Sequence, residues 1–273
     1  EPLMRPWIPK LVERLQAIPG IEDLGMITNA HHLKPLAQRL RDAGLNRITI
    51  SLDALDPDTF SQIIGGRAQV GTVLDGIESA HEAGFDPIKI NCVVQRGVNE
   101  QEILPLLERF GSPPYIVRFI EFMDVGNRNG WRMDSVVPAS EIVHRVQSRY
   151  RAEPIEANYP GEVAERYRFI DSAGEFGVIA SVTRPFCGGC TRIRLSAEGK
   201  LYTCLFARDG MDLKEAVRGG LSEERIEEQL RSLWSFRNDR YAEQRAEAPA
   251  EAEAAAARGE SEPSKVEMYY IGG

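Results

Sequence analysis

The stretch Ile88–Val94 reads IKINCVV, an apolar run with the composition of a buried strand. The segment before it, Val70–Ala83, has the apolar spacing of a helix and is followed by Gly84, a residue typical of helix C-termini. Ahead of that helix, Arg47–Asp53 (RITISLD) is a second predicted strand. A strand, a helix and a strand in series predict a βαβ crossover and therefore parallel strands in one sheet.

The same alternation continues on both sides of this unit. Upstream, Leu24–Asn29 (LGMITN) predicts a strand and His32–Ala43 predicts a helix that ends at Gly44. Downstream, Asn99–Phe110 predicts a helix and Ile116–Met123 (IVRFIEFM) predicts a strand. Repeated βα units favour closure into a barrel or partial barrel, so the expected fold class is α/β.

The character of the chain changes near residue 150. Short strands, a hairpin and two helices are predicted at Tyr167–Ile170, Phe176–Val182, Ile193–Ser196 with Leu201–Phe206, Met211–Arg218 and Ser222–Phe236. We therefore expect a barrel region at 1–149 and a C-terminal α+β domain at 150–244. An Ala- and Glu-rich, low-complexity linker at 245–265 and an apolar tail at 266–273 complete the predicted layout.

Composition restricts the possible functions. The chain has 273 residues, 42% of them hydrophobic, which suffices for one large domain or two modest ones. Its formal charge of -8 argues against a general nucleic-acid binder, which needs a basic surplus. No apolar run approaches the ~20 residues of a membrane span. Four cysteines, three of them clustered, fit a reducing compartment better than a disulfide scaffold, and we expect a cytoplasmic protein.

The strongest chemical signal is Cys187-Gly188-Gly189-Cys190 followed by Cys204, with the spacing C-x2-C-x13-C. Thiolates on a Gly-rich turn and on a neighbouring hairpin strand can converge on one metal centre. Structural zinc sites usually have four ligands, and the four histidines lie well upstream. Cys92 lies within an apolar strand and is interpreted as a core residue. An iron–sulfur cluster with one open iron is favoured, while zinc and no metal remain alternatives.

Arginines follow the cysteine turn in the segment Arg192-Ile193-Arg194. Residues two apart on an extended segment face the same way, and paired guanidiniums suit phosphate oxygens or a purine edge. An isolated R-x-R is more often a solvated edge strand. Beside an open metal site, the pattern indicates ligand binding.

Polar residues also occur within the predicted barrel strands. Thr49, Ser51 and Asp53 share one face of their strand, Lys89 and Asn91 share one face of theirs, and Arg118 and Glu121 interrupt an apolar strand that ends at Met123. Each could be a core polar group that is satisfied locally. Because several strands show the pattern together, a lined cavity near the carboxyl ends of the strands is predicted, where barrel enzymes place their active sites.

With these residues in view, the sequence resembles the molybdenum cofactor biosynthesis protein A family, radical S-adenosylmethionine enzymes that act as GTP 3′,8-cyclases. The matching stretches are DAGLNRITISLDALDPDTF, KINCVVQRGVNEQEI, RFIEFMDVGN, FCGGCTRIRLSAEGKLYTCLF and the terminal YIGG. The resemblance implies a partial (β/α)6 TIM-like barrel, closed by a C-terminal domain that carries a second [4Fe–4S] cluster.

The resemblance also implies roles for individual residues. The implied cluster ligands are Cys187, Cys190 and Cys204, and the free iron would take the guanine of GTP. The implied GTP-binding residues are Lys89, Arg192, Ile193 and Arg194. The residues expected to contact S-adenosylmethionine are Ser51 and Met123. Gly272 and Gly273 match a tail that reaches into the active site in this family.

The sequence departs from the family pattern in two places. Ile27-Thr28-Asn29-Ala30 stands where the family usually has Thr-Thr-Asn-Gly, so Ile27 cannot supply the hydroxyl expected to touch GTP. Glu1-Pro2 resembles the end of the family's Gly-Gly-Glu-Pro motif, which binds the methionine amino group. We therefore expect the first cluster motif, C-x3-C-x2-C, and the first barrel strands to be missing, and the chain alone to be inactive.

The implied activity converts GTP to 3′,8-cyclo-7,8-dihydroguanosine 5′-triphosphate, with a 5′-deoxyadenosyl radical taking hydrogen from C3′. The product would pass to the cyclic pyranopterin synthase, and a homodimer is compatible with the resemblance. Two rivals remain: a peptide-modifying radical enzyme with an auxiliary cluster, and a metal-binding module without catalysis. The first would normally carry more than three C-terminal cysteines.

Overall fold

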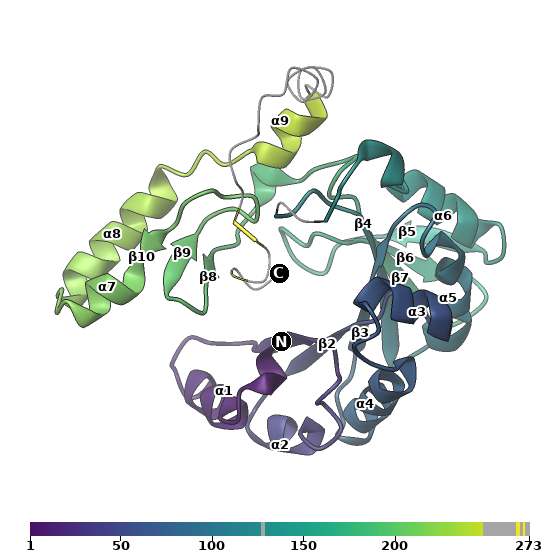
Figure 1. Ribbon diagram of the computed structural model, residues 1–273, viewed down its shortest axis with the longest axis horizontal. Helices are drawn as coiled ribbons and strands as arrows, with labels where there is room; N and C mark the ends of the chain where they lie inside the picture. The colour runs from purple at the N-terminus through teal and green to yellow at the C-terminus, as the bar shows by residue number, and fades with distance from the viewer. Residues whose placement is uncertain (127–128, 248–265, 268–269, 271–273) are drawn as a thin grey trace. The chain divides into compact units, whose positions relative to one another are not determined.

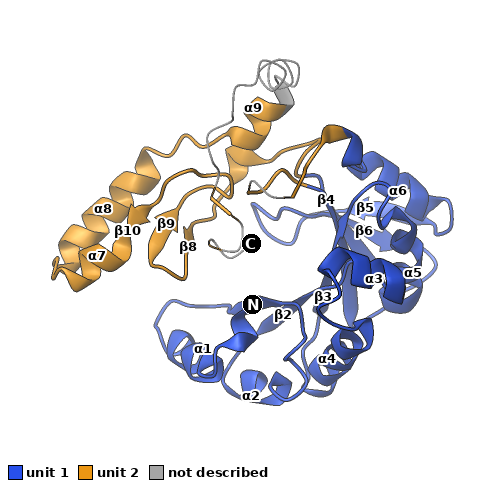
Figure 2. Cartoon of the chain, viewed as in Figure 1, with its two compact units in different colours: residues 1–122, 134–180 blue, residues 123–133, 181–273 orange. Residues whose placement is uncertain are grey.

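The computed structural model describes residues 1–126, 129–247, 266–267 and 270. The chain divides into two compact units, drawn in different colours in Figure 2. Unit 1 comprises Glu1–Phe122 and Asp134–Ala180, and unit 2 comprises Met123–Met133 and Ser181–Gly273. Each unit is described by itself below.

Unit 1 is a mixed α/β unit with a mainly parallel sheet. Seven strands of the described chain form this sheet in the order β1-β2-β3-β4-β7-β6-β5. The strands are β1 Gly25–Thr28, β2 Arg47–Ser51, β3 Ile88–Val94, β4 Tyr115–Glu121, β5 Ala152–Ile155, β6 Glu165–Phe169 and β7 Glu175–Ile179. The first five strands in this order, β1, β2, β3, β4 and β7, pair in parallel, whereas β6 is antiparallel to both β7 and β5.

Helices lie along the outer side of this curved sheet, as Figure 1 shows for α1, α2, α4, α5 and α6. The helices of unit 1 are α1 Ile8–Gln16, α2 Ala37–Asp42, α3 Pro57–Ile64, α4 Val70–Glu82, α5 Ile103–Phe110 and α6 Ala139–Gln147, with short 3-10 turns η1 Pro2–Met4, η2 Glu100–Glu102 and η3 Met133–Ser135. Helices that cover one side of parallel strands are the expected result of βαβ connections.

Alternation along the strands separates the core from the inner surface of the sheet. In β3, Ile88, Ile90, Cys92 and Val94 are buried, and the intervening residues are half-buried. Successive side chains of a strand point to opposite faces, so Lys89 and Asn91 share the face opposite to the buried residues. The prediction that Cys92 is a core residue is confirmed, because its side chain is fully buried.

Several predicted elements differ at their ends. The segment His32–Ala43 contains Pro35, which disfavours helical geometry at the residue before it, and only Ala37–Asp42 forms an α-helix. In the Asn99–Phe110 segment a 3-10 turn precedes α5, which begins at Ile103. The prediction for Met211–Arg218 missed a two-residue strand at its start, Met211–Asp212.

The boundary expected at residue 150 falls later in the structure. Strands β5, β6 and β7 belong to unit 1, because β7 pairs with β4 and extends the same sheet. The first unit therefore continues to Ala180, and in the sequence it is interrupted by Met123–Met133 of unit 2. Short antiparallel strands suggested a new domain, but they form the edge of the first sheet.

Unit 2 contains a small antiparallel sheet and three helices within its described residues. Its elements are η4 Cys187–Gly189, β8 Arg194–Leu195, β9 Lys200–Tyr202, β10 Met211–Asp212, α7 Leu213–Arg218, α8 Glu223–Ser235 and α9 Tyr241–Glu247. The predicted hairpin is confirmed, because β8 and β9 pair antiparallel. Helix α9 includes residues 245–247, the start of the predicted linker, whereas 248–265 lie outside the described residues. Across the described chain, the helices are too short or too polar to cross a membrane.

Candidate functional site

The cysteine turn lies in unit 2 and is closed by its own backbone. Cys187–Gly189 forms the 3-10 turn η4, and the Cys190 amide donates to the Cys187 carbonyl over 3.1 Å. Cys204 lies just beyond β9, the second strand of the hairpin. All three cysteines are free thiols and partly exposed. They are therefore accessible to a metal group, unlike Cys92.

Hydrogen-bond donors point at two of these sulfurs. Arg192 Nε lies 3.2 Å from Cys190 Sγ, and the Phe206 amide lies 3.4 Å from Cys204 Sγ. Burial acts to raise the pKa of the Cys190 thiol, but hydrogen bonds from Arg192 and Arg237 outweigh it and hold that pKa below its usual value. Donors of this kind stabilise thiolates, which are the form that binds metals.

Cys204 and Cys187 interact electrostatically. Burial raises the pKa of Cys204, and the charges of Asp239 and Cys187 raise it further. No group of three or more His, Cys, Asp or Glu side chains within the described chain is arranged around a single metal ion. The residues present fit an iron–sulfur cluster in their donor set, which consists of three nearby thiols with N–H donors directed at sulfur.

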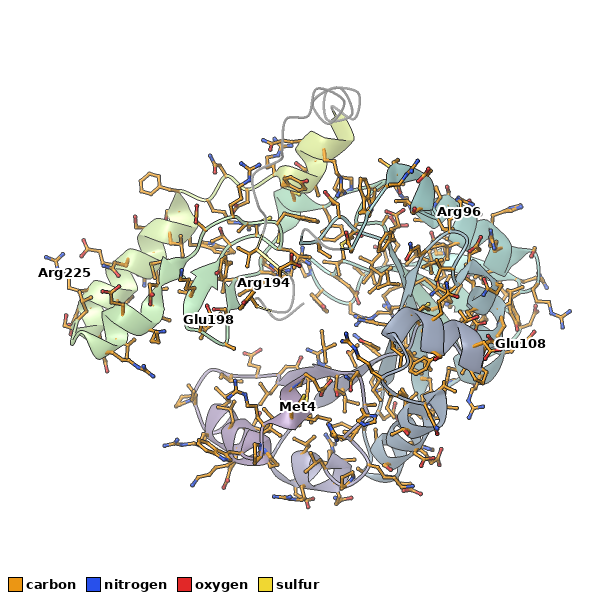
Figure 3. All side chains as sticks on the ribbon, viewed as in Figure 1. Met4, Arg96, Glu108, Arg194, Glu198 and Arg225 are labelled. Carbon is orange, nitrogen blue, oxygen red and sulfur yellow. The ribbon has the colours of Figure 1, made fainter. Side chains whose placement is uncertain are left out.

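Both arginines of the R-x-R segment face the cysteines. The Arg192 guanidinium, besides its contact with Cys190, lies 5.0 Å from the centre of the Phe186 ring. Arg194 begins β8 (Figure 3), and burial lowers its pKa, with repulsion from Arg192 acting in the same direction. Ile193 is exposed. Strand β8 is an edge strand with an exposed Leu195, as the solvated-edge alternative predicts, whereas the Arg192 and Arg194 side chains are half-buried.

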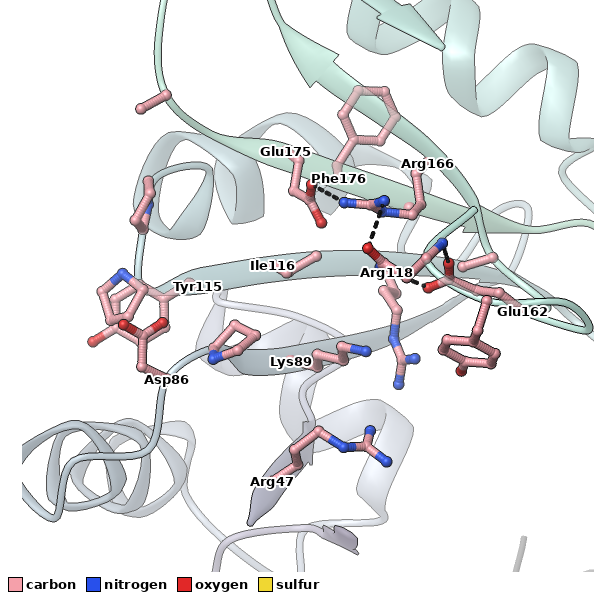
Figure 4. A pocket seen from close by; sticks show the side chains of 18 of the residues that line it. Arg47, Asp86, Lys89, Tyr115, Ile116, Arg118, Glu162, Arg166, Glu175 and Phe176 are labelled. Atoms are coloured by element: carbon pink, nitrogen blue, oxygen red, sulfur yellow. Dashed lines mark hydrogen bonds and ion pairs between the residues drawn. The ribbon is translucent and has the colours of Figure 1, made fainter. Parts of the chain in front are cut away.

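Unit 1 contains a charged cavity of about 600 Å³ on the inner side of its sheet. Figure 4 shows Lys89 of β3 and Arg118 of β4 lying side by side, with Arg47 of β2 nearby. Burial lowers the pKa of Lys89, and repulsion from Arg118 and Arg47 lowers it further. Burial likewise lowers the pKa of Arg118. An anion would relieve both the desolvation and the repulsion of these cations.

Carboxylates of this cavity are mostly occupied by other partners. Asp23 binds Arg47 over 2.6 to 2.8 Å, and Glu175 binds Arg166 over 2.6 Å. Within the described residues, neither Lys89 nor Arg118 forms an ion pair with a carboxylate, although Arg118 Nε donates to Asn91 Oδ1 over 2.9 Å. Two cations are thus held together in a half-buried cavity.

The sequence reasoning identified only part of this cavity. Arg118 was recognised as an interruption of its strand, whereas Arg47, Arg166, Tyr159 and Glu162 were not singled out. The cavity is lined by the first residues of β2, β3, β4 and β7 and by Pro87 and Pro114, which precede β3 and β4, so it lies toward the amino ends of these strands. For this cavity the predicted position near the carboxyl ends of the strands is wrong. Glu121 is fully buried and accepts a 2.7 Å hydrogen bond from the Ala139 amide, so this contact joins the end of β4 to the start of α6.

A second cavity of about 610 Å³ lies elsewhere in unit 1 and is lined by Ser51 and Asp53. Glu1 also lines it, accepting hydrogen bonds from Thr28 Oγ1 over 2.7 Å and from the Asn29 amide over 2.8 Å. Burial raises the pKa of Asp53 to about 6, although the Val93 amide donates to its carboxylate over 2.7 Å. The predicted polar strand residues therefore line two cavities, one holding the adjacent cations Lys89 and Arg118 and one holding Ser51 and Asp53.

The remaining predicted residues are less informative. Met123 belongs to unit 2, and its carbonyl accepts a 2.8 Å hydrogen bond from Asn129. Ile27 is 54% exposed at the end of β1, and Ala30 adopts a left-handed φ of 59° where the family pattern has glycine. Gly272 and Gly273 lie outside the described residues.

Two family models match the chain. Residues 1–110 match the family model described as Radical SAM superfamily, and residues 115–243 match Molybdenum Cofactor Synthesis C. Together the two matches cover most of the chain and define it as a radical S-adenosylmethionine protein.

Individual relatives narrow the class further. The chain is 50% identical to a GTP 3′,8-cyclase of Xanthomonas campestris pv. campestris strain B100 over 273 residues, 100% of this chain and 77% of the relative. It is 48% identical to a GTP 3′,8-cyclase of Acidothermus cellulolyticus, covering 79% of it, and 43% identical to that of Staphylococcus aureus strain JH9, covering 78%. The chain belongs to the GTP 3′,8-cyclase family.

Proposed function

We propose that this chain is part of a GTP 3′,8-cyclase of molybdenum cofactor biosynthesis, a lyase that uses S-adenosylmethionine and iron–sulfur chemistry. The observation that carries the proposal is the contact between Arg192 and Cys190, because it joins a nucleotide-binding cation to a thiolate of the cysteine turn. The identity of 50% to a relative named for this activity supports it.

We assign the metal group to Cys187, Cys190 and Cys204 as a [4Fe–4S] cluster, the second of the two that the family resemblance implies. A cluster held by three cysteines supplies, when bound, one iron that is open to a ligand atom of the purine. The protein contributes the donors at Cys190 and Cys204, which favour the thiolate form.

We assign GTP binding to two groups of residues, which would contact different parts of the nucleotide. In unit 2, Arg192, Ile193 and Arg194 flank the cysteine turn, where two guanidiniums and an exposed apolar side chain suit a purine and its oxygens. In unit 1, Lys89 contributes a cation that lacks a carboxylate partner among the described residues, and a triphosphate would neutralise it.

We assign S-adenosylmethionine to the cavity lined by Ser51 and Asp53, with Met123 as a further contact and Gly272 and Gly273 as a tail that reaches the active site. We further propose that the unit 1 sheet is part of a (β/α)6 barrel. The product would pass to the cyclic pyranopterin synthase in the cytoplasm, and the protein could form a homodimer.

Equilibrium binding of GTP and ATP to cluster-loaded and cluster-free protein tests the proposal. Guanine offers ligand atoms that adenine does not match, so we expect GTP to bind more tightly, with a preference that shrinks without the cluster. Arg192→Ala removes a charged partner from a desolvated site and should cost on the order of 2–5 kcal/mol. The exposed Arg218→Ala is the control and should change little. Equal affinities in every sample would overturn the proposal.

Iron content tests the metal assignment. Anaerobic reconstitution should load about four irons per chain. Cys204→Ser should reduce this loading and Cys92→Ser should leave it unchanged, because Cys92 is buried beneath the sheet. One tightly bound zinc and no capacity for a cluster would instead support the structural alternative.

A further inference from the structure

Helix α9, Tyr241–Glu247, contacts the cysteine turn through one side chain. Glu243 Oε1 accepts a 3.0 Å hydrogen bond from the amide of Gly188, which lies between Cys187 and Cys190. The other carboxylate oxygen of Glu243 binds Arg240. A carboxylate from residue 243 therefore holds a turn that lies more than fifty residues earlier in the sequence.

The same helix also contacts the segment of the third cysteine. The rings of Tyr241 and Phe206 are stacked, with centroids 4.8 Å apart. The Phe206 amide donates to Cys204 Sγ, as described above. One helix thus contacts the Cys187–Cys190 turn by a hydrogen bond and the Cys204 segment by an aromatic stack.

Helix α9 is itself fixed within unit 2. Tyr241 Oη donates to Asp124 Oδ2 over 2.7 Å, and Arg245 forms an ion pair with the same carboxylate. The side chains of Arg245 and Asp124 are each only 8% exposed. The Arg245 guanidinium also lies 5.3 Å from the Trp131 ring centre. Buried ion pairs of this kind resist displacement of one partner, because separation leaves a charge buried.

From these contacts we infer that Glu243 is a positioning residue, which sets the spacing between the Cys187–Cys190 turn and Cys204 and tunes the reduction potential of the group they hold. The inference rests on the proposed function. Only residues 191–193 separate Cys190 from β8, so the chain itself joins the cysteine turn to the hairpin. Helix α9 adds a contact to the Gly188 side of that turn and a second one to the segment of Cys204. The negative charge of Glu243 beside the cysteine turn disfavours addition of an electron there.

Three variants separate positioning from charge. Glu243→Gln keeps an oxygen that can accept from Gly188 and removes the charge, whereas Glu243→Ala removes both. Glu227→Gln on α8 is the control, since Glu227 forms only an exposed pair with Arg231. Each protein is reconstituted anaerobically, and the measurements are iron per chain, the rate of iron loss to a chelator, and the reduction potential from a spectroscopically monitored titration.

We expect Glu243→Ala to lose iron roughly tenfold faster than the unaltered protein, as other residues that support metal ligands do. Glu243→Gln should retain iron nearly as well, with a potential shifted to more positive values. Glu227→Gln should match the unaltered protein in all three measurements. Circular dichroism verifies that each variant is folded.

The outcomes distinguish this inference from the proposed function. If the unaltered protein takes up no cluster, the proposed function fails. If it takes up the cluster, but Glu243→Ala releases iron at the unaltered rate and Glu243→Gln leaves the potential in place, the positioning role is refuted while the proposed function stands. An unchanged potential in Glu243→Gln refutes the tuning of the potential even if Glu243→Ala does not fold.

Discussion

Lys89 illustrates at the scale of one residue how a binding site can oppose stability. Its ammonium is half-buried beside Arg118, and burial and repulsion lower its pKa. A lowered lysine pKa means that the charged form is disfavoured in the folded state. This cost is present below the lowered pKa, neutral pH included, and is relieved as the pH rises through it.

Lys89→Met should therefore raise the free energy of unfolding at neutral pH, by less than about 1 kcal/mol because solvent screens a half-buried charge, and it should weaken binding of inorganic tripolyphosphate. Urea unfolding and calorimetric titration measure the two effects. Lys34→Met is the matched control, because Lys34 forms an exposed pair with Asp75 over 3.0 Å and should affect neither quantity strongly. Loss of stability together with unchanged binding would contradict the assignment of Lys89 to an anion site.

The lowered pKa of Lys89 also predicts a pH dependence of binding. An anion favours the protonated ammonium, so tripolyphosphate affinity should fall as the pH rises through the lowered pKa, below the 10.5 of an ordinary lysine. Lys89→Arg keeps its charge in this range and should bind with much less pH dependence. An identical decline in both proteins would assign the effect to another group.

At the scale of elements, helix α4 packs closely against the segment after β1. A Cβ at Gly76 would lie 2.7 Å from the Ala30 carbonyl oxygen, a backbone atom that cannot move aside cheaply. Gly76→Ala should cost about 2 kcal/mol, the range of overpacked cores. Gly71→Ala lies in the same helix, with no atom within 4 Å of its Cβ, and should be stabilising by up to about 1 kcal/mol. Chemical denaturation of both variants checks the contrast, and equal effects would disprove the close packing.

Glu141 on α6 joins that helix to the segment after β3. Its carboxylate binds Arg96 over 2.6 Å and Arg145 over 2.7 Å, and these hydrogen bonds, Arg96 first, lower its pKa from 4.5 to about 2. The stabilisation is fully present above pH 4.5 and is lost as the pH falls toward about 2. Because the side chain is about a third exposed, solvent screening reduces its contribution to about 1 kcal/mol.

Glu141→Gln should lower the free energy of unfolding at neutral pH by that amount, and it should flatten the loss of stability between pH 4.5 and about 2. Unfolding measured across this interval is the check. Glu153→Gln, which removes the exposed partner of Arg168, should leave the acid profile nearly unchanged. A Glu141→Gln profile parallel to that of the unaltered protein would show that the pairs contribute little.

The elements also show what a sequence can and cannot predict. Strand β3 occupies the predicted Ile88–Val94, because its alternation of buried and half-buried residues is local information. The sequence could not show that Lys89 and Ser51 line different cavities, since they lie on neighbouring strands. Where each cavity lies depends on segments outside the strands, which the strand pattern does not predict. Strand β5 was missed because Pro154 lies within it, and a proline in a strand normally argues against that assignment.

At the scale of the whole molecule, the two units differ in how much apolar core they contain. The large cluster of buried apolar residues lies entirely in unit 1, from Leu3 to Ala180. The described part of unit 2 buries few large side chains, among them Leu201 and Tyr202. A unit with a small core depends more strongly on a bound metal group for its stability.

Calorimetry should therefore resolve two transitions in anaerobically reconstituted protein, and removal of iron by a chelator should lower only one of them. Amide hydrogen exchange should show that removal of iron reduces protection in unit 2 and leaves protection in unit 1 unchanged. Equal shifts of both transitions would mean that the units unfold together. Cys204→Ser should reproduce the iron-free profile.

The pairing of β3 with β4 crosses the boundary between the two family models that match this chain. The two matched family models meet between residues 110 and 115, and the seven paired positions from Ile88 opposite Tyr115 to Val94 opposite Glu121 join strands on either side of that division. Residues 115–243 produced alone would present β4 as an open edge, with Val117 and Phe119 uncovered although both are fully buried in unit 1. Such an edge recruits other chains. The range of the second family model therefore does not coincide with an independent folding piece, because its first strand completes a sheet whose other strands lie in the first range.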